Sequence, residues 1–469
     1  MKVPGILGHI AIKIDKEGGI PILVGGAVRD FILGSESKDF DVEVFNIHYN
    51  QLIAVLKKFG KVSAVGKAFG VLKLSNAGHQ FDFSLPRNDT KTGEGHRGFR
   101  ITTNPNMSFR TAASRRDFTI NSIGFNLISG EILDEFGGQS DLKDKILRVV
   151  DPATFVEDPL RVLRGIQFAA RFNLEIPEAT KSILIDLIDT LDQLPRERIF
   201  KEVRKLLLKA QKPSSGLLIA DEIGLNKKLF PELNALHSIP HDPDWYPQND
   251  AWSHTLSVID EAARLRCGDK FKDMALMLSA LCHEFTSLNP VEFVDEQWRK
   301  QYRTAQCPTV TKCFMNRITN ESRLIEMVDR LVTEHRSLAK TLRSTNIKNG
   351  DIRRLSLKVD IPLLVKLAEA DYYGRFKEEE RPVSFPAGEW LLKRFHALKL
   401  ESGQNLQPIL LGRHLISLGL KPGPFFGQIL TDAYEKQLDD EFMTLDDAIS
   451  WAQNQIDRVS GAKPKRFGN

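Results

Sequence analysis

The chain has 469 residues, a length that favours several domains, and its 42% hydrophobic and 27% charged residues are typical of a globular protein. Its net charge is only +4, so a surface that binds nucleic acid must be local. Four cysteines without a CxxC pair exclude a disulfide framework and favour a reducing, cytoplasmic compartment, and no segment approaches the ~18 apolar residues of a membrane span.

The first 150 residues predict a domain of mixed α and β structure. The run IPILVGG indicates a short buried strand that ends at Gly25 and Gly26, and AVRDFILG indicates a helix that stops at Gly34. Strict alternation in DFDVEVF (39–45) predicts the next strand. Further strand-like runs are KVSAVG, VLKLS, HQFDFSL and GEILDEFGG.

Two aspartates in the second strand carry the first functional signal. Side chains two residues apart on a strand point the same way, so Asp39 and Asp41 share one face. Two carboxylates so close repel each other unless a cation lies between them, and Mg²⁺ is the divalent ion that combines few carboxylates with substrate phosphates. Asp82, on another alternating strand, supplies a third carboxylate, and such a set can serve the attacking and leaving oxygens of phosphoryl transfer.

A glycine pair lies between the first predicted strand and the helix that follows it, and this pair strengthens the interpretation of a phosphoryl-transfer site. Backbone N–H groups at Gly25 and Gly26, at the start of a helix, predict an anion site for a triphosphate. Arg29, one turn into the helix, is expected to reach the same phosphates. The alternative is a plain strand-to-helix turn that needs glycine for a positive φ.

From about Asp151 onward, long 3.6-residue periodicities predict helices throughout. The helix predicted at 196–212 carries seven Lys and Arg against two acidic residues, and the segment 87–116 has the same net charge of +5. Such concentrations indicate either contact with a phosphate backbone or a solvated surface. The residues predicted to bind RNA on the helix are Arg198, Lys201, Arg204 and Lys205.

Four motifs in a fixed order resemble a known family. LVGGAVRD…DFDVEVF, SRRDFTINSIGFN (114–126), LDEFGGQSDLKDKILR (133–148) and EDPLRVLRGIQFAARF (157–172) are similar to the signatures of the class II tRNA nucleotidyltransferases and bacterial poly(A) polymerases. The resemblance implies an α+β, polymerase-beta-like head with a mixed sheet, followed by an all-α neck, an HD-like body and a tail. The corresponding predicted divisions are 1–150, 151–236, 237–385 and 386–469.

The resemblance also implies roles for individual residues. Asp39 and Asp41 would hold Mg²⁺, Asp82 would orient or deprotonate the attacking hydroxyl, and CTP, ATP and the tRNA 3′ end would be the substrates. The nucleotide would contact Gly25, Gly26, Arg29, Arg116, Asp117, Asn121, Asp158, Arg161 and Arg164.

The segment EDPLRVLR also has a chemistry of its own. Asp158 can only accept hydrogen bonds and Arg161 can only donate them, and at i and i+3 they lie on one helix face. Beside a nucleotide they would imitate a base-pairing partner for cytosine and adenine and reject uracil and guanine, which present a carbonyl to the carboxylate. The alternative is a surface ion pair.

Other segments bear on whether the chain resembles the CCA-adding branch of the family or the poly(A) polymerase branch. AVGKAFGVLKL (64–74) and FDFSLPRNDTKTGEGHRGF resemble the CCA-adding branch, with a flexible loop expected between Pro86 and Ser114. An acidic residue is expected near Arg110 or Thr111 in that branch, and its absence leaves an enzyme that adds only CC as an alternative. A poly(A) polymerase and an enzyme that adds only A are further alternatives within the family.

A second set of residues resembles an HD phosphohydrolase. Its predicted metal ligands are His254, His283, Glu284 and Asp371, with Glu284 where the family pattern has Asp. His335 is a further candidate ligand, and a helical scaffold without metal is the alternative. LGRHLISLGLKPGPFFGQIL (411–430) resembles a tail motif of some family members, with a turn that suits RNA phosphate.

Overall fold

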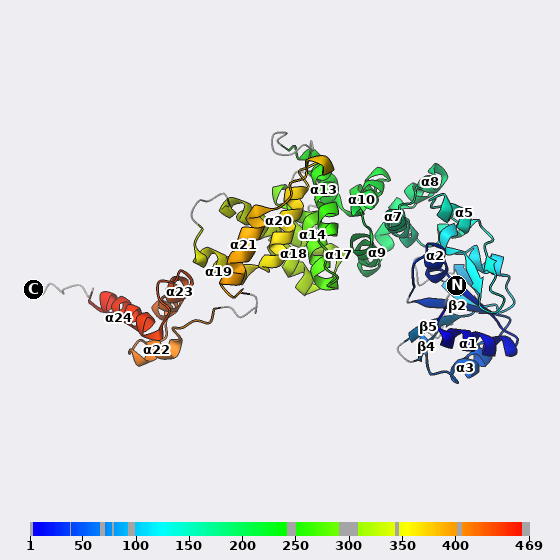
Figure 1. The fold of residues 1–469 in the computed structure, drawn as a ribbon, viewed down its shortest axis with the longest axis horizontal. Helices are drawn as coiled ribbons and strands as arrows, with labels where there is room; N and C mark the ends of the chain where they lie inside the picture. The colour runs from blue at the N-terminus through cyan, green and yellow to red at the C-terminus, as the bar shows by residue number, and fades with distance from the viewer. Residues whose placement is uncertain are drawn as a thin grey trace, which may run out of the picture. The chain divides into compact units, whose positions relative to one another are not determined.

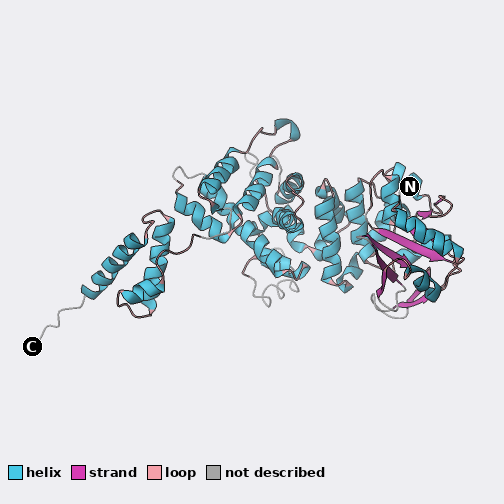
Figure 2. Ribbon diagram, turned by 60° about the horizontal axis from the view of Figure 1, so that its bottom comes forward, coloured by secondary structure: helices cyan, strands magenta, loops and turns pink. Residues whose placement is uncertain are grey.

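The structure, a computed structural model, describes residues 3–37, 39–65, 71–76, 79–91, 99–241, 250–289, 308–342, 347–400 and 406–461. The chain forms two compact units, Met1–Asn234 and Ala235–Asn469. The strands lie in the first unit, and the described part of the second unit is built from helices (Figures 1 and 2). The four-part division expected from the sequence remains a prediction.

The first unit is organised around a seven-stranded mixed sheet of order β3-β4-β5-β2-β1-β8-β9. Within it β2 and β5 run parallel, whereas the other neighbouring strands pair antiparallel. A separate antiparallel pair joins β6 and β7. The strands are β1 (Ile20–Val24), β2 (Phe40–Phe45), β3 (Lys61–Val65), β4 (Val71–Asn76), β5 (His79–Ser84), β6 (Arg87–Lys91), β7 (Phe99–Thr103), β8 (Gly124–Asn126) and β9 (Ile132–Leu133).

The alternation of apolar and acidic residues in β2 and β5 decides which side chains point into the core and which point away from it. Phe40, Val42, Phe81 and Phe83 are buried, which fixes the register because a slip by one residue would place them all on the opposite face. In that register Asp41 pairs directly with Asp82 across the two parallel strands. The hydrophobic pattern therefore brings two acidic side chains together.

Several helices precede, connect and follow the strands of the sheet. The glycine turn at Gly25 has φ 72° and ψ −137°, a conformation that glycine adopts without strain, and α2 begins at the next residue. The head helices are α1 (Gly5–Lys16), α2 (Gly26–Ile32), α3 (Tyr49–Leu56), α4 (Phe109–Ala113), α5 (Gly138–Lys143) and α6 (Pro152–Phe155).

Beyond the sheet, the amphipathic helices α7 and α9 pack together, as expected from their 3.6-residue periodicity. Helix α7 lies against both α9 and α10 (Figure 1). Leu206 of α9 and Ala170 of α7 both approach Gly216 of α10, which shows how close the helices come. The helices are α7 (Leu160–Phe172), α8 (Glu178–Asp186), α9 (Arg196–Lys209), α10 (Pro213–Glu222), α11 (Leu225–Leu229) and α12 (Pro231–Ala235).

In the second unit, α13, α14, α18 and α20 pack against one another, and α21 lies on α20. None of the helices in the described ranges is long and apolar enough to cross a membrane. The helices are α13 (Ala251–Arg264), α14 (Lys270–Cys282), α17 (Val310–Ile318), α18 (Ser322–Leu342), α19 (Asn349–Lys358), α20 (Ile361–Tyr373), α21 (Pro386–Ala397), α22 (Gly412–Ser417), α23 (Pro424–Leu438) and α24 (Leu445–Gly461).

Two local expectations differ from the structure, and one element was not predicted. The described residues between Pro86 and Ser114 form β6, β7 and α4 rather than a loop throughout, and residues 92–98 lie outside the described ranges. GEILDEFGG gives only the two-residue strand β9. The N-terminal segment forms α1, whose Leu7, Ile10 and Ile14 are spaced for one buried helix face.

Candidate active site

The sheet, α2 and α7 enclose a pocket of about 440 Å³ in the first unit. All nine residues predicted to bind the nucleotide line it, together with Asp41 and Phe168. Asp39 and Asp82 are not among its lining residues. The lining residues are Gly25, Gly26, Arg29, Asp41, Arg116, Asp117, Asn121, Asp158, Arg161, Arg164 and Phe168.

Strands β2 and β5 bring acidic side chains together beside the pocket, and Asp41 of this group lines it. Loss of solvent and the charge of Asp82 raise the pKa of Asp41, and Asp39 raises it further, whereas Arg116 lowers it. Lys73 of β4 forms an ion pair with Asp82, with 3.0 Å between Nζ and Oδ2. Neighbouring carboxylate oxygens are the donor set that a hard divalent cation prefers.

Glu43 is a site residue that the sequence interpretation missed. It lies two residues beyond Asp41 on β2, so it continues the alternating series of acidic side chains on one strand face. Its Oε2 accepts a hydrogen bond from Nη2 of Arg116 at 3.2 Å. The signal was present in the pattern DxDxE, and the consequence is that Glu43 fixes the guanidinium of a pocket-lining arginine.

The glycine turn lies beside the guanidinium of Arg116. A Cβ atom added to Gly25 would lie 3.4 Å from Nη1 of Arg116. Arg29 is buried, and its Nη1 donates to Oδ1 of Asn121 at 2.6 Å while its Nη2 pairs with Asp30 at 2.6 Å. Arg29 is therefore part of the pocket wall, with donors already used by protein groups.

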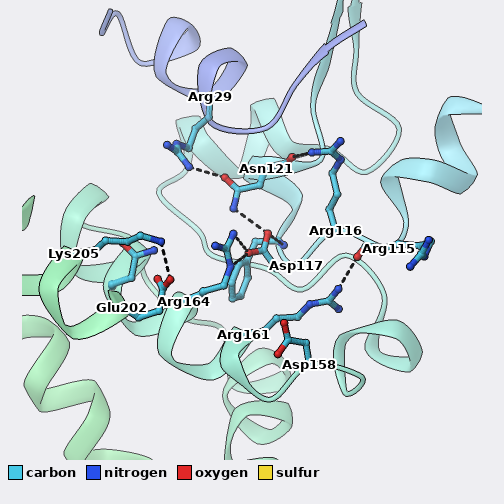
Figure 3. A network of polar contacts seen from close by, with 12 residues as sticks. Arg29, Arg115, Arg116, Asp117, Asn121, Asp158, Arg161, Arg164, Glu202 and Lys205 are labelled. Atoms are coloured by element: carbon cyan, nitrogen blue, oxygen red, sulfur yellow. Dashed lines mark hydrogen bonds and ion pairs between the residues drawn. The ribbon is translucent and has the colours of Figure 1, made fainter. Parts of the chain in front are cut away.

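A chain of charged and amide groups continues from Arg29 into α7 (Figure 3). Nδ2 of Asn121 donates to Oδ1 of Asp117 at 3.0 Å, and Nε of Arg164 donates to Oδ2 of Asp117 at 2.6 Å. Burial alone would raise the pKa of Asp117, but the charge of Arg164 and these hydrogen bonds hold it below its ordinary value. Asp117 and Asn121 thus reach the pocket from a fixed, ionised network.

The predicted base-reading pair is held by other parts of the chain. Arg161 donates from Nη1 to the carbonyl of Thr154 at 2.7 Å. Its Nη2 donates to the carbonyl of Arg115, also at 2.7 Å (Figure 3). Burial lowers the pKa of Arg161. Oδ1 of Asp158 accepts from the backbone N–H of Leu160 at 3.1 Å. The guanidinium and the carboxylate line the same pocket.

The basic helix α9 does not present all its cations to solvent. Nη2 of Arg198 pairs with Oδ2 of Asp158 at 2.9 Å, and Nζ of Lys205 pairs with the buried Glu202 at 2.7 Å. The guanidinium of Arg204 lies over the Phe200 ring, 4.8 Å from its centroid. Lys201 is exposed.

A separate polar cluster is buried in the second unit. His254, His283 and Asp371 each offer a ligand atom within 4.8 Å of the others, and among the described residues this is the group that fits a metal ion by that criterion. His335 contacts Asp371 at 3.3 Å, and Arg375 also pairs with Asp371. Glu284 is not a member of this group, but its Oε1 lies 3.6 Å from Nε2 of His283, and its role as a ligand stays a prediction.

Electrostatics in this cluster follow from its burial. Burial lowers the pKa of His283 to about 4. Burial also opposes the charge of Asp371, but hydrogen bonds from His254 and His335 hold its pKa well below the ordinary value. Glu284 lies 3.7 Å from His241, a neighbouring histidine that the sequence interpretation did not include. No spacing rule marks His241, because it precedes α13 in an irregular segment.

Two family descriptions match the first unit. Residues 22–148 match the Poly A polymerase head domain, and residues 173–236 match the probable RNA and SrmB-binding site of polymerase A. The matched head contains the glycine turn, the acidic strand face, Asp117 and Asn121. The fold and these matches define a nucleotidyltransferase of the polymerase-beta-like type.

Relatives that match most of the chain show more closely which kind of nucleotidyltransferase this is. A multifunctional CCA protein of Xanthomonas campestris pv. campestris is 33% identical over 427 residues, which cover 88% of this chain and 96% of the relative. A multifunctional CCA protein of Stenotrophomonas maltophilia is 32% identical over 429 residues, covering 89% and 98%. The chain belongs to the family of CCA-adding tRNA nucleotidyltransferases, enzymes that use a divalent metal.

Solved structures show the same fold. The Bacillus stearothermophilus CCA-adding enzyme in complex with CTP matches with a TM-score of 0.71 at 20% identity, covering 99% of this chain and 100% of that one. The Thermotoga maritima CCA-adding enzyme complexed with tRNA matches with a TM-score of 0.59 at 21% identity, covering 97% and 96%.

Proposed function

We propose that this chain adds C, C and A to the 3′ end of tRNA without a nucleic-acid template, using CTP and ATP. The observation that carries the proposal is the convergence of all nine predicted nucleotide-binding residues, with Asp41, on one pocket of about 440 Å³. That volume lies within the range of small-molecule sites, and the lining combines an acidic edge with several arginines. The names of the relatives support CCA addition, and the few cysteines support action in the cytoplasm.

The donor set fits Mg²⁺. Asp39 and Asp41 would hold the ion, because neighbouring carboxylates raise the pKa of Asp41 and a hard cation relieves their repulsion. When bound, Mg²⁺ supplies Lewis-acid stabilisation of the charge that develops on the phosphates. Asp82 is placed beside Asp41 in the β5 register, and it would accept or orient the proton of the attacking hydroxyl.

The reaction is an in-line displacement. The 3′-hydroxyl oxygen of the tRNA forms a bond to the α-phosphorus of CTP or ATP, the bond to the bridging oxygen breaks, and pyrophosphate leaves. The backbone at Gly25 and Gly26, with Arg116, would bind the triphosphate. Asp117 and Asn121 would bind the ribose, and their hydrogen bonds to each other and to α7 hold them in place.

Base selection rests on Asp158 and Arg161. The carboxylate would accept from N4 of cytosine or N6 of adenine, and the guanidinium would donate to the ring nitrogen beside it. Uracil and guanine would leave a carbonyl facing the carboxylate, and a site built for a donor rejects such ligands strongly. The backbone bonds of Arg161 orient its guanidinium before the nucleotide arrives.

The test uses purified protein, Mg²⁺, labelled CTP or ATP, and tRNAs that end before CCA, after C, or after CC. Addition of two C and one A supports the proposal. Long A tails on any RNA would replace it with a poly(A) polymerase, and arrest after CC, or addition of A alone, would replace it with a partial enzyme. The same assay with Mn²⁺ in place of Mg²⁺ tests the identity of the ion.

A second activity is favoured by one observation, the proximity of His254, His283 and Asp371 in the second unit. Two histidines and a carboxylate are a ligand set for a divalent transition metal, and the activity would be that of an HD-type phosphohydrolase. Metal-dependent phosphate release from a 2′,3′-cyclic nucleotide, retained after Asp41→Ala and lost after His254→Gln, would support it. Absence of bound metal in dialysed protein, together with no release, would leave the cluster a structural element.

A further inference from the structure

We propose that Arg198 of α9 is a positioning residue for base selection, one that holds the Asp158 carboxylate, and not a contact to the RNA backbone. The inference rests on the proposed function. Asp158 immediately precedes α7, Arg198 lies in the first turn of α9, and α7 and α9 pack together. Helix packing therefore brings together two side chains forty residues apart in the sequence.

The carboxylate is held at both oxygens. Oδ1 accepts the backbone N–H of Leu160 at 3.1 Å, and Oδ2 accepts Nη2 of Arg198 at 2.9 Å. A carboxylate has about four acceptor positions, so two such bonds fix its plane and leave capacity for the exocyclic amine of a base. The two partners come from different helices, which makes the orientation depend on the neck and not on α7 alone.

The ion pair between Arg198 and Asp158 is expected to contribute little to the free energy of folding. The side chains of Arg198 and Asp158 are 31% and 35% exposed, and ion pairs with that much solvent contribute weakly to folding. A bound base would cover the carboxylate and remove that solvent. The interaction then strengthens at the moment when the carboxylate reads the base.

The orientation that Arg198 imposes also has a consequence for specificity. A carboxylate only accepts hydrogen bonds, so Asp158 suits the exocyclic amine of cytosine or adenine and not the carbonyl of uracil. The planar guanidinium of Arg198 donates to Oδ2 in a fixed direction and so holds these acceptor oxygens toward the base. Losing it should relax selection against UTP.

Lys201 provides the matched control. It lies on the same helix one turn after Arg198, carries the same charge and is exposed. If α9 acts mainly by attracting RNA, Lys201→Met and Arg198→Met should have similar effects. If Arg198 positions Asp158, the two variants should differ in base selection.

The experiment measures kcat/KM for CTP and UTP, and KM for a tRNA that ends before CCA, in the full chain. For Arg198→Met we expect the CTP-over-UTP ratio to fall about 10- to 100-fold, the range for a hydrogen bond to a charged group, with the KM for tRNA little changed. Arg198→Lys should restore part of the ratio. Lys201→Met should leave the ratio unchanged.

A double variant separates positioning from general damage. Once Asp158→Asn has removed the carboxylate, adding Arg198→Met should not lower the ratio further, because the two residues act through one interaction. An unchanged ratio with a raised KM for tRNA would overturn the inference and make Arg198 an RNA contact. Additive losses in the double variant would overturn it too.

Folding and the underlying activity are checked separately. Thermal melting identifies a misfolded Arg198→Met. In that case Arg198→Ala, which also removes the donor to Asp158, replaces it with the same expected loss of selection. If the unsubstituted chain incorporates no CTP into tRNA, the proposed function fails. If it does incorporate CTP and only the ratio is insensitive to Arg198, the proposed function survives and this inference fails.

Discussion

The pocket of the first unit and the buried cluster of the second combine the same chemical groups in opposite settings. In both, a carboxylate is held by basic side chains: Asp117 by Arg164 in the pocket, and Asp371 by His254 and Arg375 in the cluster. The pocket lining surrounds a space of about 440 Å³, whereas His254 and His283 are almost completely buried. A convergent set of polar residues therefore does not by itself indicate a site for a substrate.

The pocket and the cluster differ in whether the protein already supplies positive partners for their acidic groups. Asp41 has a raised pKa beside Asp82, so its surroundings favour an added cation. Asp371 has a pKa held far below its ordinary value, so the protein already supplies its positive partners. Substitutions in the pocket should consequently change activity, and substitutions in the cluster should first change stability.

The largest effect is expected from Asp41→Ala. Removing a carboxylate that would hold the metal should lower the rate of C addition by about 10³-fold, because metal stabilisation of a phosphoryl transition state amounts to several kcal/mol. Melting temperature should not fall, since the substitution removes like-charge repulsion. Single-turnover addition of labelled CTP measures the rate, with the exposed Glu36→Gln as control. A residual rate within tenfold of the original would contradict the comparison.

Asp371→Asn should have the complementary effect. It leaves Arg375 and the buried histidines without their negative partner, at a cost of about 3 kcal/mol in the free energy of unfolding. C addition at temperatures below the transition should be unchanged. Calorimetric melting and the addition assay measure the two quantities, and Asp446→Asn, at an exposed position of α24, is the control. Loss of C addition with unchanged melting would mean that the cluster serves the main reaction.

The pH dependence of Asp117→Asn gives the third test. Because the folded pKa of Asp117 is lowered, its ionised form contributes stability that is present above the ordinary pKa near 3.8 and is lost as the pH falls through the lower folded value. At pH 7 the variant should be less stable by about 2 kcal/mol, the size of a hydrogen bond to a charged group. Urea unfolding at pH 7, 5, 4 and 3.5 should show this gap narrowing only at the acid end. A constant gap would contradict the assignment.

The strands and turns of the head could be predicted from the sequence because they depend on local residue patterns. Alternation predicted a strand at 39–45, and the structure has β2 at Phe40–Phe45, with Asp41 on the strand and Asp39 directly before it. The glycine pair marked the turn before α2. The nine nucleotide-binding residues were named from motifs, and the structure brings them to one pocket, although their individual roles remain predictions.

The partners of charged side chains could not be predicted in this way. Arg198 was expected to face RNA, but it pairs with Asp158 because α9 packs on α7, a contact between helices distant in sequence. Arg29 was expected to reach phosphates, but Asn121 and Asp30 take its donors. Sequence patterns specify which face of an element is polar, and tertiary packing decides what that face meets.

Gly25→Ala should give the smallest effect and the finest comparison. Gly25 has φ 72° in a region that side chains avoid, so alanine should cost about 1–2 kcal/mol in stability. Its Cβ would also lie 3.4 Å from Nη1 of Arg116, so the KM for both CTP and ATP should rise with little change in the choice between them. Gly8→Ala is the matched control, because Gly8 lies within α1 with open space around its Cβ position, and alanine there should be neutral or stabilising. Urea unfolding and nucleotide titrations separate the two contributions. If KM stayed constant while stability fell, the turn would serve the fold alone, and the triphosphate would have to bind elsewhere along the pocket.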